Sequence, residues 1–112
     1  LARLVGPSRA RDIMFSARFM PAREAYEMGL INFIRERDAI ESACIDYAKI
    51  IANNAPLTVK AAKAAVNAWE RGSRDDEVEA VRAMVDDCFN SEDYREGRKA
   101  FANKRTPEFK NR

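Results

Sequence analysis

Apolar residues along most of this chain recur every three or four positions, which is the period of one face of an α-helix. The pattern predicts long helices near 38–53, 56–71, 76–90 and 92–103, and two short helices before residue 30. Three of these stretches carry continuous apolar stripes: Ile40, Ala43, Cys44, Tyr47 and Ile51; Thr58, Ala61, Ala62, Ala65, Val66 and Trp69; Val78, Val81, Val85, Cys88 and Phe89. The expected fold class is therefore all-α.

Residues that start and stop helices stand where the stripes begin and end. Pro56 occupies the first turn of its stretch, where the missing N–H of proline costs nothing. Gly29 and Gly72 follow helical stretches and accept the left-handed conformation of a helix C-terminus. Asp38 with Glu41 resembles a capping box, and Ser91 is the expected N-cap of the last helix.

One run departs from the helical pattern. Residues 30–34, Leu-Ile-Asn-Phe-Ile, are β-prone but too short to found a sheet, so at most one very short strand is expected there.

Composition indicates a globular, intracellular polypeptide. The 112 residues fit one ordinary domain, with 46% hydrophobic and 34% charged residues. No apolar run approaches the roughly 20 residues that span a bilayer, and no signal peptide is expected in the first residues. Cys44 and Cys88 are expected as buried free thiols, which favours the cytoplasm or an organelle matrix. The first residue is Leu, so a fragment of a longer protein is expected.

Charge is distributed unevenly along the second half of the chain. Residues 70–93 carry nine acidic and three basic side chains, and residues 94–112 carry seven basic and two acidic ones. A basic tail after an acidic helix indicates either an anionic partner or pairing within the chain. Nucleic acid is a weak candidate for that partner, because the tail contains two acids and no aromatic-rich surface.

The sequence lacks the residues of a complete catalytic site. It contains no histidine, which removes the commonest general base and most metal sites. The four glycines are scattered, so no phosphate-binding loop is present. The acid pairs Asp75/Glu79 and Asp86/Asp87 lie on the polar side of a helix, where a solvated face is a better interpretation than a catalytic or metal-binding pair. We expect no catalytic residue, no metal ligand and no cofactor.

The last helix contains the candidate binding residues, Phe101 and Lys104. They are three positions apart and are predicted on one helix face. An aromatic ring beside an ammonium can cover a purine base while the charge meets a phosphate. The alternative is that Phe101 is a core anchor and Lys104 a solvated side chain. Gly97 nearby would let another group approach the helix closely.

An ordered set of short motifs resembles the C-terminal part of the enoyl-CoA hydratase/isomerase (crotonase) superfamily. Nearly the whole chain is covered, and the motifs follow the family's order and spacing. They are Leu1–Gly6; Ser16-Ala-Arg18 through Pro21–Ala25 and Gly29–Asn32; Ala48 through Pro56-Leu57; Ala62-Lys63; Ser91–Asp93; Glu96-Gly97; Ala100-Phe101; and Lys104-Arg105. Ala17 replaces the family's usual glycine, and Met20 stands where a Ser or Asp cap is common.

The resemblance implies that the catalytic groups and the helical domain are carried by different parts of the protein. In the family, two backbone N–H groups stabilise the charge on an acyl-CoA thioester, and acidic side chains move the proton and water. Those groups would lie upstream of Leu1. Residues 1–34 would be the end of the crotonase-like core, and residues 35–112 a helical domain that builds trimers or hexamers. Phe101 and Lys104 would contact the CoA adenine and 3′-phosphate, with coenzyme A as part of the substrate.

The implied function is part of an enoyl-CoA hydratase, a lyase that adds water to 2-enoyl-CoA thioesters. Two alternatives remain open at this point. One is another crotonase-family reaction, such as isomerisation, dehydration, decarboxylation or hydrolysis. The other is a non-catalytic helical oligomerisation module. The isolated chain is expected to be inactive in every case.

Overall fold

The computed structural model describes all of residues 1–112 and is helical, with no β-strand. The first helices are α1 (Ala2–Ser16) and α2 (Ala22–Glu27). A 3₁₀ turn, η1 (Arg37–Ala39), then leads into α3 (Ile40–Ala52). The chain continues with α4 (Pro56–Glu70), α5 (Asp75–Asn90) and α6 (Glu92–Ala102). The all-α prediction is confirmed, and the four long helices end within a residue or two of their expected bounds.

The residues form two compact units, Leu1–Ala43 and Cys44–Arg112. These bounds describe packing within this chain. The division expected from the family resemblance, residues 1–34 and 35–112, concerns roles in a larger protein and stays a prediction.

Helix α1 contains a kink at Gly6. Its φ of 80° and ψ of 161° are not helical, and Pro7 restarts the helix immediately afterwards. The helix ends at Ala17, which adopts the left-handed conformation with φ 46°. A residue with a Cβ adopts this conformation at a cost, so the glycine that the family pattern prefers at this position suits the turn better.

An ion-pair network joins α1 to α2. Arg18 binds Asp12 at 3.4 Å and forms two bonds to the carboxylate of Glu24. The pKa of Glu24 is lowered mainly by the hydrogen bond from Arg18. Beyond α2, Gly29 takes a φ of 78°, as expected, and residues 30–34 form no strand. The backbone N–H groups of Leu30 and Ile31 instead donate to the Ala25 carbonyl, at 2.9 and 3.4 Å.

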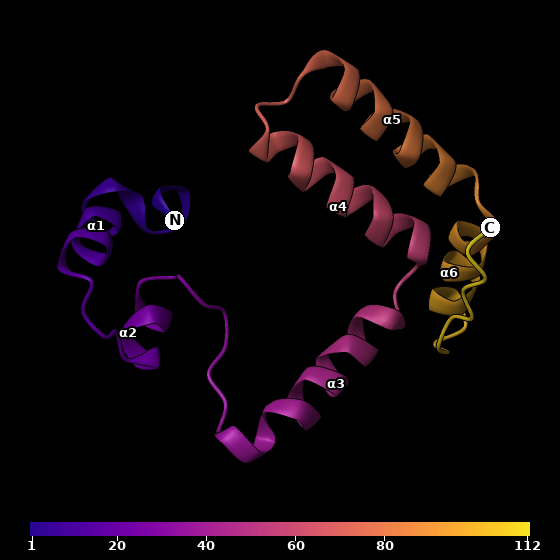
Figure 1. Ribbon diagram of the computed structural model, residues 1–112. Helices are drawn as coiled ribbons and strands as arrows, with labels where there is room; N and C mark the ends of the chain where they lie inside the picture. The colour runs from indigo at the N-terminus through magenta and orange to yellow at the C-terminus, as the bar shows by residue number, and fades with distance from the viewer. The chain divides into compact units, whose positions relative to one another are not determined.

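In the second unit, α4 and α5 lie side by side and run in opposite directions, joined by a short turn at Gly72 (Figure 1). The contact is made through small residues, because Ala61 and Ala68 are the buried positions of α4. Two short side chains let the helix backbones approach closely. Helix α5 then contacts α6.

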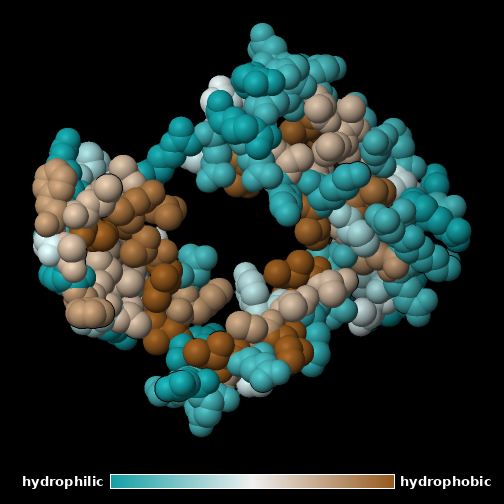
Figure 2. All heavy atoms as spheres, in the orientation of Figure 1, coloured by the Kyte–Doolittle hydropathy of each residue, from teal (hydrophilic) through white to brown (hydrophobic).

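The apolar stripes are largely unburied in this chain. Figure 2 shows hydrophobic side chains at the molecular surface beside hydrophilic ones. Trp69 of α4 is 70% exposed and Phe89 of α5 is 58% exposed. No residue of α3 is buried, although its stripe is regular. Helical periodicity therefore identified the apolar faces, and the packing within each unit leaves much of their area exposed.

Two local predictions were wrong. Asp38 is not an N-cap, because the 3₁₀ turn begins before it and Glu36 takes the N-cap position without a side-chain hydrogen bond. Cys44 is exposed and Cys88 is half-buried, so only the expectation that both are free thiols is confirmed. Cys44 lies on the uncovered face of α3, which explains its exposure.

None of the helices has the length and apolar character that crossing a bilayer requires.

Candidate functional site

Helix α6 begins with a hydrogen-bonded cap. The Ser91 hydroxyl accepts from the Tyr94 backbone N–H at 3.0 Å and donates to the Cys88 carbonyl at 2.7 Å. The first bond satisfies an N–H that the helix leaves open, and the second holds the cap to the end of α5. Ser91 is buried, so the predicted cap also fixes the direction in which α6 leaves α5.

The other end of α6 closes in a Schellman motif. The Lys104 N–H donates to the Phe101 carbonyl at 3.1 Å, and the Arg105 N–H donates to the Ala100 carbonyl at 3.0 Å. Lys104 occupies the position that most often holds glycine, and its φ is 51°. A lysine in this left-handed conformation costs about 1 kcal/mol relative to glycine.

The structure changes the expected relation between Phe101 and Lys104. Phe101 is in the last turn of α6, but Lys104 lies beyond the helix, so the two do not share a helix face. Phe101 is 88% exposed and is not a core anchor here, whereas the adjacent Ala100 is fully buried. Lys104 is also exposed and has no side-chain hydrogen bond or ion pair.

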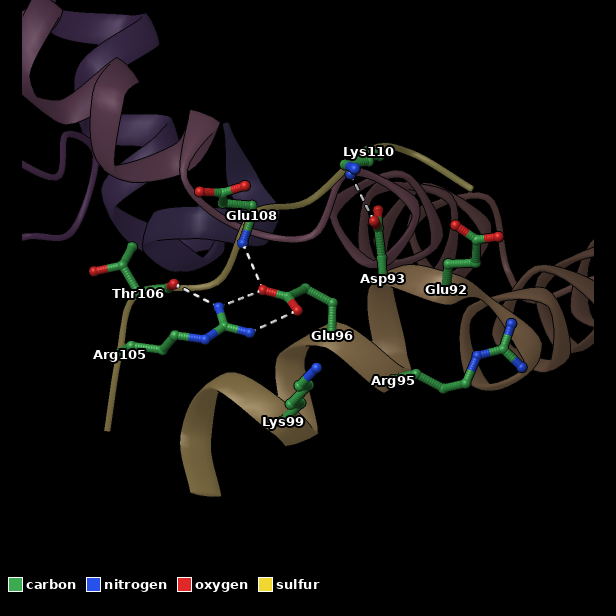
Figure 3. A pocket seen from close by; sticks show the side chains of 9 residues that line it. All are labelled: Glu92, Asp93, Arg95, Glu96, Lys99, Arg105, Thr106, Glu108 and Lys110. Atoms are coloured by element: carbon green, nitrogen blue, oxygen red, sulfur yellow. Dashed lines mark hydrogen bonds and ion pairs between the residues drawn. The ribbon is translucent and has the colours of Figure 1, made fainter. Parts of the chain in front are cut away.

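The residues after Lys104 turn back along α6. The Arg105 guanidinium forms two hydrogen bonds to Glu96, Nη1 to Oε1 at 2.6 Å and Nη2 to Oε2 at 2.8 Å. The backbone N–H of Glu108 donates to the same carboxylate at 2.9 Å. Figure 3 shows these groups converging on Glu96. The bonds from Arg105 and Glu108 lower the pKa of Glu96 to about 2.

Asp93 holds the end of the chain in the same way. Its carboxylate accepts from the backbone N–H groups of Lys110 at 2.6 Å and Asn111 at 2.8 Å. Its own N–H donates to the Arg112 carbonyl at 3.0 Å. Asp93 is 2% exposed, so these donors replace the water that the carboxylate has lost.

The contacts partly decide between the two interpretations of the basic tail. Arg105 pairs with Glu96, and Arg112 pairs with Glu92 at 3.0 Å. These two charges are therefore used within the chain. Lys104 is not, and it remains available to an external anion.

Gly97 lies beside Phe109 of the C-terminal tail, at a distance that would admit a Cβ. A Cβ at this position would lie 3.6 Å from Cε1 of Phe109. The group that approaches the helix here is thus a side chain of the protein's own tail. The C-terminal tail and α6 line an open pocket of about 520 Å³, and all of its lining residues except Thr106 are charged (Figure 3).

Sequence reasoning did not assign a role to Glu96, Arg105 or Asp93. They were quoted only as parts of family motifs. The pairing of Glu96 with Arg105 crosses nine positions and a helix end, so helical spacing rules could not find it. Asp93 is the second residue of α6, and its burial could not be predicted because the sequence does not distinguish it from the adjacent acid Glu92.

No catalytic arrangement is formed by the acid pairs of α5. Glu79 lies 3.6 Å from Arg82 on an exposed helix surface. No group of three or more potential ligand side chains could hold a metal ion.

Comparisons with known proteins identify the family to which the chain is similar. Residues 1–112 match the family described as enoyl-CoA hydratase/isomerase. The short-chain-enoyl-CoA hydratase of Clostridium acetobutylicum is 34% identical over 113 residues, covering 100% of this chain and 43% of that protein.

Solved structures give the same result. A crystal structure of enoyl-CoA hydratase from Bacillus anthracis is 31% identical with a TM-score of 0.88, covering 99% of this chain and 43% of the other. One from Mycobacterium tuberculosis is 28% identical with a TM-score of 0.88, covering 100% and 44%. The chain therefore spans less than half the length of the relatives it matches.

Proposed function

Because this chain belongs to the enoyl-CoA hydratase/isomerase family, we propose that it is the C-terminal part of an acyl-CoA enzyme that hydrates 2-enoyl-CoA thioesters. In this proposal, the residues supply coenzyme A contacts and oligomerisation surfaces. The catalytic acids and the backbone donors that stabilise the thioester charge lie elsewhere in the protein.

The absence of histidine and of a pocketed acid pair supports this division of labour. The named relatives are hydratases, and this chain accounts for 43% of the Clostridium protein's length. Hydration requires a carboxyl group placed beside the thioester. The acid pairs Asp75/Glu79 and Asp86/Asp87 of α5 are exposed and offer no such environment.

The coenzyme A assignment rests on one observation, the exposure of Phe101 and Lys104. Both are exposed at the end of α6, and neither is engaged by another side chain of this chain. A flat apolar ring suits the adenine, and an unpaired ammonium suits the 3′-phosphate. Both residues also fall on the family motif.

Exposed apolar residues support the oligomerisation role. A hollow of about 420 Å³ between α4 and α5 is lined almost entirely by apolar groups, including Ala62, Ala65, Val85 and Phe89. Full burial of a side chain such as Phe89 contributes about 1.5–3 kcal/mol. Contiguous apolar surface of this kind usually marks an interface. The assembly expected is a trimer or hexamer of the complete protein.

The reaction is tested by supplying the purified complete protein with crotonyl-CoA and following loss of the enoyl-thioester absorbance. We expect conversion to 3-hydroxybutyryl-CoA, identified by mass. Isomeric 3-enoyl-CoA and malonyl-type thioesters serve as competing substrates. Turnover of one of these without hydration would assign a different reaction of the family.

Residues 1–112 expressed alone form the matched control and are expected to give no hydration. Hydration by this chain above a contaminant control would contradict the division of labour. Its association, measured by sedimentation, tests the second role. A chain that stays monomeric at high concentration would contradict an interface on these apolar faces.

A further inference from the structure

The turn that carries Lys104 is held from both sides by α6. On one side, the Lys104 and Arg105 N–H groups bond to carbonyls of the last helical turn at 3.1 and 3.0 Å. On the other side, the Arg105 guanidinium is fixed to Glu96 by two hydrogen bonds. Lys104 lies between the end of α6 and Arg105, which is attached both through its backbone and through its side chain.

This double attachment has a specific consequence for Lys104. Its left-handed backbone is unfavourable for a residue with a Cβ, so a free turn would relax from it. Relaxation would rotate the direction in which the lysine side chain leaves the backbone. Such a rotation would displace the backbone of Arg105, whose guanidinium is held by two hydrogen bonds to Glu96. The ion pair therefore opposes relaxation of the adjacent residue.

We propose that Glu96 and Arg105 are positioning residues that hold Lys104 in its left-handed conformation and so aim its ammonium at the nucleotide part of the substrate. This inference rests on the proposed coenzyme A contact and adds residues that do not touch the substrate. The charges of Glu96 and Arg105 neutralise each other, so we expect neither residue to bind the substrate directly.

The effect of losing the ion pair should be smaller than that of losing Lys104. Without the pair, the ammonium is still present but must be ordered when the substrate binds. Ordering one flexible side chain costs about 0.5–1.5 kcal/mol, which corresponds to a rise in KM of roughly twofold to tenfold. The chemical step takes place elsewhere, so kcat should be unchanged.

The test is a double-mutant cycle in the complete protein, with KM and kcat measured for an enoyl-CoA thioester. The variants are Glu96→Gln, Lys104→Ala and the double variant. If Glu96 acts through Lys104, the double variant has the same KM as Lys104→Ala. Rises in KM that multiply in the double variant would overturn the inference, because Glu96 would then act independently.

Two further variants separate positioning from general loss of structure. Glu92→Gln removes the other ion pair between α6 and the tail, with Arg112, and should leave KM unchanged. A KM for Glu92→Gln as high as that of Glu96→Gln would overturn the inference. Arg105→Lys keeps the charge but loses the paired bonds, and it should raise KM within the same range. It replaces Glu96→Gln in the cycle if that variant fails to fold.

The cycle also distinguishes two kinds of failure. If Lys104→Ala leaves KM unchanged, the coenzyme A contact itself is wrong. If Lys104→Ala raises KM and neither Glu96→Gln nor Arg105→Lys changes it, only the positioning role of Glu96 and Arg105 is wrong.

Discussion

Replacing Lys104 with glycine should stabilise the protein and weaken its binding of substrate at the same time. Glycine adopts a φ of 51° without the Cβ clash that lysine suffers. The lysine side chain makes no bond within this chain, so none is lost on substitution. The expected gain in unfolding free energy is about 1 kcal/mol.

Lys104→Ala is the matched control, since alanine has the same Cβ and the same conformational cost. Its stability should equal that of the original protein, within a few tenths of a kcal/mol as expected for an exposed site. Both variants lack the ammonium, so both should raise KM for the CoA thioester equally. One charge-assisted contact of about 1.5–3 kcal/mol corresponds to roughly a tenfold to hundredfold rise.

The measurements are urea unfolding and steady-state kinetics on the same preparations. A glycine variant no more stable than the alanine variant would refute the left-handed strain at residue 104. A glycine variant with an unchanged KM would refute the binding role. High salt should shrink the KM effect but not the stability difference.

Three further predictions concern α6. Ser91→Ala should lower the unfolding free energy by about 1 kcal/mol through loss of the helix cap, measured by urea unfolding; an unchanged midpoint would contradict the cap. Gly97→Ala should stabilise the protein by about 0.5–1 kcal/mol, because its Cβ would meet Phe109 at an ordinary contact distance of 3.6 Å; a loss of stability would show tighter packing there. Glu96→Gln removes a carboxyl group whose pKa in the folded protein is about 2, below its usual 4.5. The ionised carboxylate therefore stabilises the folded protein above about pH 5, and this stabilisation is lost as the pH falls towards 2. The difference in thermal midpoint between the two proteins should therefore shrink over that range, and a pH-independent difference would count against the ion pair.

The helices could be predicted from the sequence because their signals are local. Apolar spacing, Pro56 and Gly72 each act within one or two turns, and the structure confirms them. The failure at Asp38 has a local cause too, since a 3₁₀ turn before α3 moved the helix start. Periodicity identified which faces are apolar but not which of them this chain covers.

The site was less predictable, because its defining contacts join distant residues. Phe101 and Lys104 were singled out by their spacing and by a family motif, but the prediction that they share a helix face was wrong. Helix α6 ends at Asn103, and the left-handed turn that follows contains no glycine from which it could be predicted. The pairing of Glu96 with Arg105 depends on that turn and so could not be predicted before it.

The central claim is that the end of α6 binds the nucleotide part of an acyl-CoA substrate. It is tested most directly by assaying Lys104→Ala in the complete protein with two substrates, the enoyl-CoA thioester and the matching pantetheine thioester without the nucleotide. The expected result is a rise in KM for the CoA thioester alone, with kcat unchanged for both. An equal effect on both substrates would contradict the claim, because Lys104 would then influence catalysis without contacting the nucleotide.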